Sequence, residues 1–256
     1  MTTPKHTDAV RDHYTRIASG SQSCCSTPSC CSSDTSGSLP AYVTQSMNEP
    51  YRNVDPHVLE VADLGLGCGT PVEHAGLRPG MTVLDLGAGA GIDVFLAARI
   101  VGPEGHVIGL DMTDAMLERA EANRRHLNVS NAEFRKGEIE QMPVDSGSVD
   151  RVISNCVINL VADKRRAFSE IQRVLRPGGE FTVSDIVYTG RMPAEVRSDP
   201  EMVACCIGGA LERDEYLQLI HSAGFEDLSI VSERHYPVAA GQPYGLLSVT
   251  VKGVKR

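Results

Sequence analysis

The sequence predicts an α/β fold in which helices cover both faces of a mostly parallel sheet. Two observations lead to this prediction. Between residues 82 and 190, short apolar segments alternate with segments of helical periodicity, and this alternation is typical of parallel sheets. The chain has 256 residues, which is enough for one large α/β domain with additional pieces.

The N-terminal part of the chain precedes this alternation. Residues 1–20 are expected to contain a helix, because Val10, Tyr14 and Ile17 fall on one helical face. Residues 21–40 are rich in serine, glycine and cysteine. Side chains this small and polar cannot form a core, so we expect a flexible segment there.

The remaining elements follow in order along the chain. Residues 41–80 are expected to be irregular and to end in the loop GLGCGTP, where the glycines beside Cys68 let the backbone turn freely. We expect strands at residues 82–87, 106–111, 132–137, 149–155, 179–187, 225–238 and 245–256. We expect helices at residues 91–101, 114–127, 163–179 and 213–225, the third ending at Pro177 and the glycines after it. The last two strands complete the sheet, with one antiparallel member.

Charge and composition exclude several functions. The formal net charge is -9 and no basic stripe offsets it, which argues against binding to nucleic acid. The apolar runs have the length of strands, so no membrane span is expected. The N-terminus lacks the apolar core of a signal peptide, which favours a cytoplasmic protein. In that reducing compartment the eight cysteines are expected to be free thiols.

The first expected strand ends in the glycine-rich turn DLGAGAGI. Its residues Asp85, Gly87, Ala88 and Gly89 precede a helix, so the backbone can approach a ligand closely beside a slightly positive helix end. The next strand ends in Asp111, at the spacing where an acidic side chain meets ribose hydroxyls. Together they predict a nucleoside site, and the alternative is an ordinary tight turn with a surface aspartate.

These motifs resemble those of the class I methyltransferases, whose Rossmann-like domain binds S-adenosylmethionine. The resemblance runs from about residue 75 to 190, within a domain expected to span residues 41–190. It implies that the glycine turn lies by the methionine part and that Asp111 binds the ribose. The residues that the resemblance puts beside the adenine are Met112, Gly137, Glu138 and Ile139. Asn155, at the end of the fourth strand, faces the same crevice.

Cysteines stand near this expected site. Cys156 follows Asn155 at the carboxyl edge of the sheet, Cys68 lies between glycines, and Cys206 begins the segment CIGGAL. Thiolates bind soft, thiophilic centres well, and trivalent arsenic or antimony takes three of them. Zinc favours four ligands, often in CxxC pairs, which are absent. A buried structural cysteine is the alternative interpretation of Cys156.

A second resemblance is more specific. NCVINLVADKRRAF, GEIEQMPV, LGCGTP, LRPGGEFTVSDIV and CIGGAL are similar to segments of the arsenite S-adenosylmethionine methyltransferases. The resemblance implies that Cys68, Cys156 and Cys206 hold the arsenic, with Cys206 preferred to Cys205 by its place in CIGGAL. Residues 191–256 are then an arsenic-binding region with the closing strands. The family also has a tyrosine near the sulfonium, for which Tyr14 is the candidate, although helix packing explains Tyr14 equally well.

The expected function is methylation of arsenite, and of methylarsenite in later rounds, for arsenic detoxification. S-adenosylmethionine is the expected methyl donor, and a thiol reductant, glutathione or thioredoxin, is the expected co-substrate. Cys24, Cys25, Cys30 and Cys31 either relay arsenic or have no role. Two alternatives remain open: a methyltransferase of a small organic acceptor, and a metalloid sensor without catalytic activity.

Overall fold

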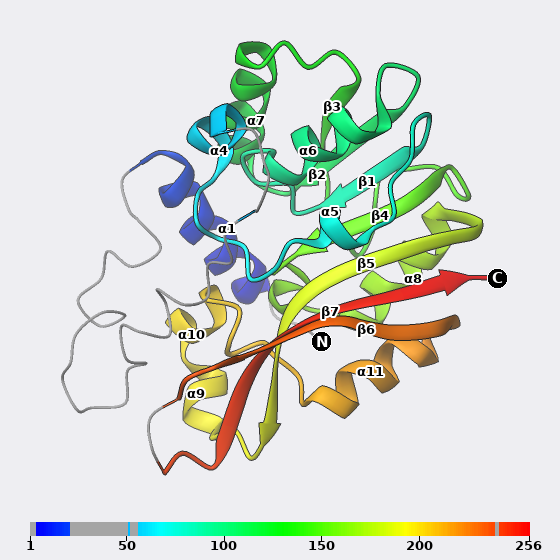
Figure 1. The fold of residues 1–256 in the computed structure, drawn as a ribbon. Helices are drawn as coiled ribbons and strands as arrows, with labels where there is room; N and C mark the ends of the chain where they lie inside the picture. The colour runs from blue at the N-terminus through cyan, green and yellow to red at the C-terminus, as the bar shows by residue number, and fades with distance from the viewer. Residues whose placement is uncertain (1–3, 21–50, 52–55, 239–240) are drawn as a thin grey trace.

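The computed structural model describes residues 4–20, 51, 56–238 and 241–256, and they form one sheet between two layers of helices (Figure 1). The sheet has seven strands in the order β3-β2-β1-β4-β5-β7-β6. The strands are β1 Thr82–Leu86, β2 His106–Asp111, β3 Ala132–Lys136, β4 Val149–Asn155, β5 Leu175–Gly190, β6 Phe225–Tyr236 and β7 Tyr244–Lys255. The first five pair in parallel, and β7 runs antiparallel to both β5 and β6. The mostly parallel sheet with one antiparallel strand is therefore confirmed.

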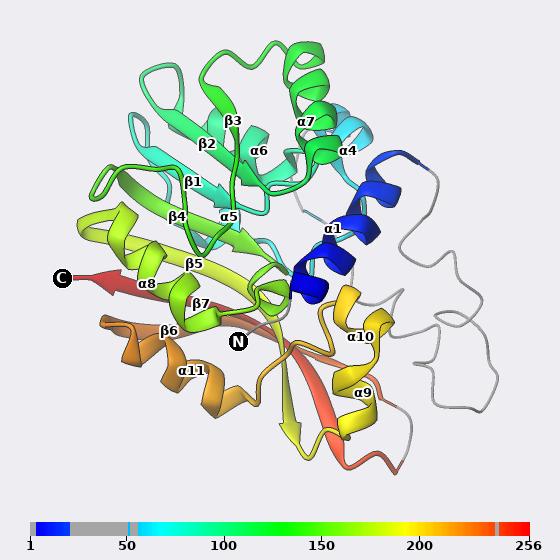
Figure 2. The same cartoon turned by 180° about the vertical axis from the view of Figure 1, so that it is seen from behind.

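Helices cover both faces of the sheet. They are α1 Pro4–Ala18, α4 Pro56–Ala62, α5 Pro71–His74, α6 Ile92–Val101, α7 Asp114–His126, α8 Lys164–Val174, α9 Ala194–Ser198, α10 Pro200–Ala204 and α11 Arg213–Ser222, with a 3-10 turn η1 at Ile158–Leu160. Helices α4, α5 and α6 pack together on one face, while α8 and α11 cover the other. Helix α1 lies against α7 and α10, as the view from behind shows (Figure 2).

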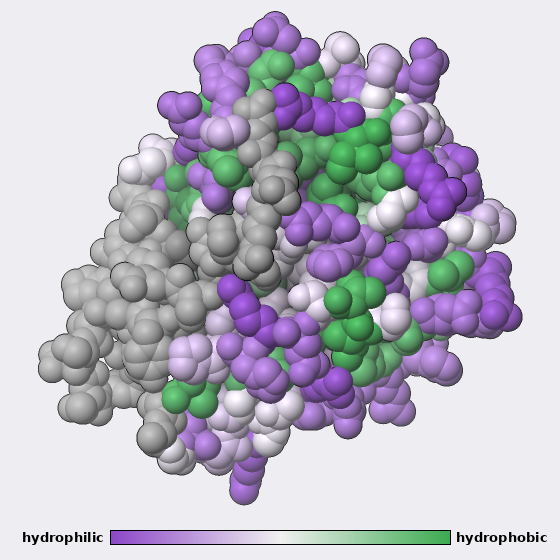
Figure 3. All heavy atoms as spheres, viewed as in Figure 1, coloured by the Kyte–Doolittle hydropathy of each residue, from purple (hydrophilic) through white to green (hydrophobic). Residues whose placement is uncertain are grey.

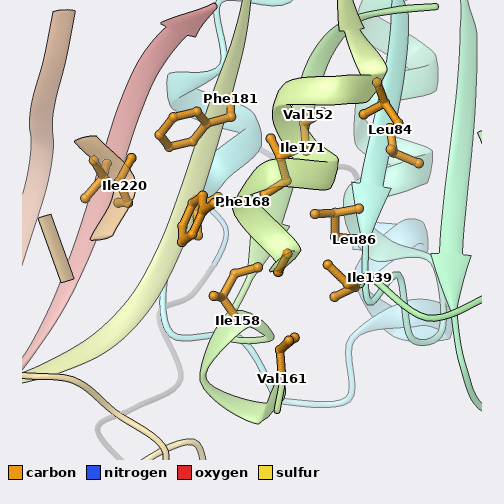
Figure 4. Close-up of a cluster of buried hydrophobic side chains, with 14 of the residues drawn as sticks. Leu84, Leu86, Ile139, Val152, Ile158, Val161, Phe168, Ile171, Phe181 and Ile220 are labelled. Atoms are coloured by element: carbon orange, nitrogen blue, oxygen red, sulfur yellow. The ribbon is translucent and has the colours of Figure 1, made fainter. Parts of the chain in front are cut away.

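The larger core cluster lies between the sheet and the helices α8 and α11 (Figure 4). In α8 the apolar side chains of Phe168 and Ile171 point to the sheet and are fully buried. Phe168 meets the ring of Phe181 on β5 edge-on, with 5.9 Å between the centroids. Removing a buried phenylalanine of this kind costs about 3–5 kcal/mol. This packing fixes β4 and β5, whose ends carry the candidate site.

The structure corrects the expected end of the third helix. Helix α8 begins after the Asp163 N-cap, whose carboxylate accepts a hydrogen bond from the Arg166 N–H at 2.9 Å, and it ends at Val174. The expected helix, within residues 163–179, was ended by Pro177 and the glycines after it. Pro177 disfavours a helical conformation at the residue before it, and the chain is already extended at Leu175, where β5 begins.

Residues 41–80 are more regular than expected. The described part of this region, residues 51 and 56–80, contains the short helices α4 and α5, whose Val58, Ala62 and Val72 are buried. The expected flexible segment at 21–40 lies outside the described residues, as do its cysteines Cys24, Cys25, Cys30 and Cys31.

The surface mixes polar and apolar groups (Figure 3). Charged and polar residues occupy much of the face shown, with smaller apolar areas between them. Among the residues that the structure describes, no helix has both the length and the apolar character needed to cross a bilayer.

Candidate functional site

One cavity lies at the carboxyl ends of β1, β2 and β4, the edge where open α/β sheets bind their ligands. It contains about 1200 Å³ of empty space, part of which is open solvent. Every expected cofactor residue lines it: Asp85, Gly87, Ala88, Gly89, Asp111, Met112, Gly137, Glu138, Ile139 and Asn155.

The glycine turn after β1 forms one wall of the cavity. Gly87 and Gly89 have φ of 65° and 52°, a region that residues with a Cβ rarely adopt. A Cβ added at Gly87 would lie 2.4 Å from the side chain of Val157, whereas one at Gly89 would meet no atom closer than 3.9 Å. The turn therefore leaves open space beside its backbone at Gly89, as a site that cradles a ligand requires.

Asp111 at the end of β2 is tied to this turn. Its carboxylate accepts hydrogen bonds from the N–H groups of Gly89 at 3.0 Å and Thr113 at 2.8 Å. Each carboxylate oxygen keeps a further lone pair, so Asp111 can still accept bonds from ligand hydroxyls. Burial raises the pKa of Asp111, and the backbone hydrogen bonds oppose that rise.

Two further carboxylates are buried in the same wall. Burial, with Asp93 and Asp111 nearby, raises the pKa of Asp85 well above its usual value. Burial also raises the pKa of Asp93 to about 6. The Tyr51 hydroxyl donates to one oxygen of Asp93 at 2.8 Å, and the other oxygen has no hydrogen-bond partner among the described residues. A cationic ligand bound beside these carboxyl groups would favour their ionised forms, so this wall is suited to a cation.

The structure brings the three expected arsenic ligands together from distant segments. Cys68 precedes α5, Cys156 follows β4 and Cys206 follows α10. All three are buried in one cluster, and the Cys206 and Cys68 thiols raise the pKa of the Cys156 thiol. The Cys206 thiol also donates to the Cys156 carbonyl at 2.8 Å, and the Cys68 thiol to the Ser184 carbonyl at 3.6 Å.

Cys156 alone of the three also lines the cavity. The neighbouring Cys205 is also buried, but it lies outside the cluster that holds the other three thiols. This placement favours Cys206 over Cys205 as a member of the thiol group.

Two of the three thiols favour the protonated state. The hydrogen bonds with Cys206 and Cys68, together with burial, raise the pKa of Cys156 well above its usual value. Burial raises the pKa of Cys68. Within the described part of the chain, no three His, Cys, Asp or Glu side chains are placed as ligands of a metal ion. A soft centre would therefore have to displace thiol protons and turn the sulfurs toward itself.

Two of these cysteines have unusual backbone conformations. Cys156 and Cys206 have φ of 61° and 64°, in the left-handed region. A conformation of this kind costs on the order of 1–3 kcal/mol outside glycine, and it persists only where the surrounding structure enforces it. At Cys156 the N–H donates to the Ser184 carbonyl at 2.7 Å. Strain of this kind gathers at functional sites.

The glycines beside Cys68 have a different role from the expected one. Neither Gly67 nor Gly69 has a positive φ, so neither is needed for a free turn. A Cβ at Gly67 would lie 2.7 Å from the Asn155 side-chain nitrogen, and one at Gly69 would lie 2.6 Å from the Ser184 hydroxyl. The loop requires these glycines because it packs directly against β4 and β5.

Other residues of the site carry no recognisable motif. Tyr51 and Asp93 line the cavity, and neither was expected from the sequence. Asp93 could have been proposed from the sequence, because it is an acidic residue in the first turn of α6, directly after the glycine turn. Tyr51 belongs to no sequence pattern that would have indicated it. Tyr14 lines the cavity from α1, and its hydroxyl donates to the Ala204 carbonyl at 3.3 Å. Its role toward a sulfonium stays a prediction.

Comparisons with known proteins agree with this geometry. A family model described as a methyltransferase domain matches residues 77–224. The chain is 43% identical to an arsenite methyltransferase from Halobacterium salinarum over 231 residues, which are 87% of this chain and 58% of that protein. It is 34% identical to an arsenite methyltransferase from Aquipseudomonas alcaligenes over 234 residues, which are 89% of this chain and 64% of that protein. The chain thus spans less than two thirds of the length of these curated relatives.

A solved structure is also similar. An arsenic(III) S-adenosylmethionine methyltransferase from Chlamydomonas reinhardtii superposes with a TM-score of 0.68 at 37% identity. The match covers 82% of this chain and 72% of that one.

Proposed function

Because the chain belongs to the arsenite methyltransferases, within the S-adenosylmethionine-dependent methyltransferases, we propose that it transfers methyl groups to trivalent arsenic. One observation carries the proposal: Cys156 belongs both to the cavity that would hold a nucleoside and to the cluster of three thiols. An arsenic atom on Cys156 would lie at the border of the two.

The cavity residues fit S-adenosylmethionine. When bound, this molecule supplies an electrophilic methyl group on a positively charged sulfur. The glycine turn would hold its methionine part, Asp111 its ribose, and Met112 and Ile139 its adenine. The buried carboxyl groups of Asp85 and Asp93 support binding of a positively charged molecule, because its charge would stabilise their ionised forms.

The three thiols would hold arsenic as substrate. Arsenite bound to small thiols exchanges them one at a time: each Cys–S–As bond that forms breaks one bond to a small thiol, which leaves with the cysteine proton. Because the pKa values of Cys68 and Cys156 are raised, exchange must remove the protons of these two thiols. Three sulfurs leave arsenic with one lone pair as its nucleophile.

Methyl transfer would then need no general base, since the arsenic carries no proton to remove. The protein's contribution is to align the lone pair with the methyl group, and positioning supplies on the order of 7–11 kcal/mol. Methylated arsenic has fewer positions for sulfur, so methylarsenite would use fewer of the cysteines. A thiol reductant, glutathione or thioredoxin, would return pentavalent product to the trivalent state, because only trivalent arsenic has the lone pair.

The direct test incubates the purified protein with arsenite, S-adenosylmethionine and glutathione, and separates the arsenic species by chromatography. We expect methylated arsenic, and none when S-adenosylmethionine is omitted. Bound arsenite without any methylated product would instead indicate a sensor. A thermal stability that does not respond to arsenite would indicate a methyltransferase of an organic acceptor.

A further inference from the structure

Asn155 and Asn159 stand on either side of Cys156, and each contacts a segment that carries another thiol. We propose that both are positioning residues of the thiol site: Asn155 fixes the Cys68 loop and Asn159 fixes the Cys206 segment against the turn of Cys156. This inference rests on the proposed function, because it concerns the same three thiols.

The side-chain amide of Asn155 holds the Cys68 loop with both of its ends. Its oxygen accepts hydrogen bonds from the N–H groups of Cys68 at 3.1 Å and Gly69 at 3.2 Å. Its nitrogen donates to the Gly69 carbonyl at 2.7 Å. These bonds join residues 86 and 87 positions apart. The amide is thus engaged with the loop, although it also lines the cavity.

Asn159 holds the Cys206 segment in a similar way. Its side chain is fully buried, and its nitrogen donates to the carbonyls of Ile186 at 2.6 Å and Cys206 at 3.0 Å. One amide therefore joins η1, β5 and the segment after α10. A Cβ at Gly209 would lie 2.0 Å from the Asn159 carbonyl oxygen, so that glycine is also required for the close approach.

These contacts act on the backbone of Cys68 and Cys206, and they thereby set where the two thiols lie. A thiol is an effective ligand only if its backbone places the sulfur within bonding distance of the shared atom. Cys206 also holds a left-handed backbone, which the surrounding structure must enforce. Loss of either asparagine should therefore release one sulfur and leave the other two thiols in place.

The test counts the sulfur atoms bonded to arsenic, using X-ray absorption at the arsenic edge on the full chain with one equivalent of arsenite. The wild type should show three sulfurs. Asn159→Asp keeps the shape of the side chain but lacks its N–H donors, and it should show two sulfurs and one oxygen. Arsenite affinity should fall about 10- to 100-fold, as is typical when groups that orient ligands are removed. Asn155→Ala should have the same effect through Cys68.

Asn131 supplies a matched control far from the thiols. Its side-chain nitrogen also donates to two backbone carbonyls, those of Ala98 at 2.9 Å and Gly102 at 2.8 Å. Asn131→Asp removes equivalent bonds and should keep three sulfurs and full arsenite affinity. S-adenosylmethionine binding reports folding in the Asn131 and Asn159 variants, and far-UV circular dichroism reports it in Asn155→Ala, because Asn155 lines the nucleoside cavity. If Asn159→Asp does not fold, Asn159→Ser removes the amide without adding a charge.

A double variant separates positioning from general damage. If Asn159 acts through Cys206, adding Asn159→Asp to Cys206→Ser should not weaken arsenite binding further, because the shared effect is already lost. A wild type with three sulfurs, together with three sulfurs and unchanged affinity in Asn155→Ala and in the Asn159 variants, would overturn the positioning role alone. A wild type with fewer than three sulfurs would overturn the three-thiol site and the positioning role together.

Discussion

Cys156 is the residue at which the nucleoside cavity and the thiol cluster meet. Replacing its sulfur with oxygen removes a soft ligand while changing the volume little. We expect Cys156→Ser to lose at least the roughly 10- to 100-fold that removing a ligand-orienting group costs in arsenite methylation, and to keep its affinity for S-adenosylmethionine. Product chromatography and calorimetry measure the two effects. A normal rate of methylation would show that Cys156 is only a packed side chain and not an arsenic ligand.

The neighbouring pair Cys205 and Cys206 provides the control. Cys206 lies in the thiol cluster, whereas Cys205 does not. Cys206→Ser should therefore lose methylation and Cys205→Ser should keep it. The opposite result would reverse the choice between the two neighbours.

Asp111 allows a separate test of the S-adenosylmethionine site. A carboxylate that accepts bonds from two ribose hydroxyls contributes on the order of 2–3 kcal/mol to binding. Asp111→Ala should weaken S-adenosylmethionine binding by that amount in calorimetry, while arsenite still binds. Unchanged affinity would remove Asp111 from the site.

Some residues of the candidate site could be predicted from the sequence, and others could not. The glycine turn and Asp111 form a spacing pattern along one strand–helix–strand unit, so they could be predicted. Asn159 could not be assigned a role, because its partners are backbone carbonyls 27 and 47 residues away. Tyr51 was missed for the same reason, since it lies 42 residues from Asp93.

At the scale of elements, α1 acts as a cover over the cavity. Thr7, Val10 and Tyr14 line the cavity from this helix, and Arg11 pairs with Glu138 across it at 3.5 Å. Ile17 is 5% exposed and anchors the end of the helix. Because α1 contacts the rest of the molecule mainly through α7 and α10, loosening it is a local event.

Ile17→Ala should therefore release α1 more than it unfolds the sheet. Truncating a buried isoleucine costs about 2–5 kcal/mol, and here that loss falls on one helix. We expect S-adenosylmethionine affinity to drop several-fold, with faster amide exchange in residues 4–18. Ile100→Ala is the control, because Ile100 is 42% exposed on α6. Equal loss in both variants would show that α1 does not cover the site.

Element boundaries were predicted well where periodicity and turn residues agree. Strand β4 has the expected bounds. Helix α8 was placed too long because its end was assigned to Pro177 and the glycines after it, whereas the helix ends at Val174. The extended conformation there depends on pairing between Leu175 and Val149, which is a long-range contact that periodicity does not contain.

For the whole molecule, stability should depend on pH through Asp185. This carboxyl is fully buried and accepts a hydrogen bond from Tyr216 at 2.9 Å. Burial raises its pKa from 3.8 to about 7. Because the folded state prefers the protonated form, this contribution to stability is complete below pH 4. This contribution is lost as the pH rises to 7, and the loss lowers the free energy of unfolding by at most about 4 kcal/mol.

Asp185→Asn should remove this dependence. The free energy of unfolding of the variant should match the wild type near pH 4 and exceed it increasingly up to pH 7, after which the difference is constant. Denaturant unfolding at several pH values measures this difference. A difference that shrinks from pH 4 to pH 7 would contradict the raised pKa.

The position of β7 has a consequence for synthesis. This strand follows β6 in the chain but lies between β5 and β6 in the sheet. On the ribosome β6 emerges first, and it has no partner in the sheet until β7 follows. Ser248 on β7 also donates to the Cys68 carbonyl at 2.6 Å. A nascent chain can therefore assemble β1 to β5 around the nucleoside cavity early, whereas its thiol site gains this last support only when β7 has been translated.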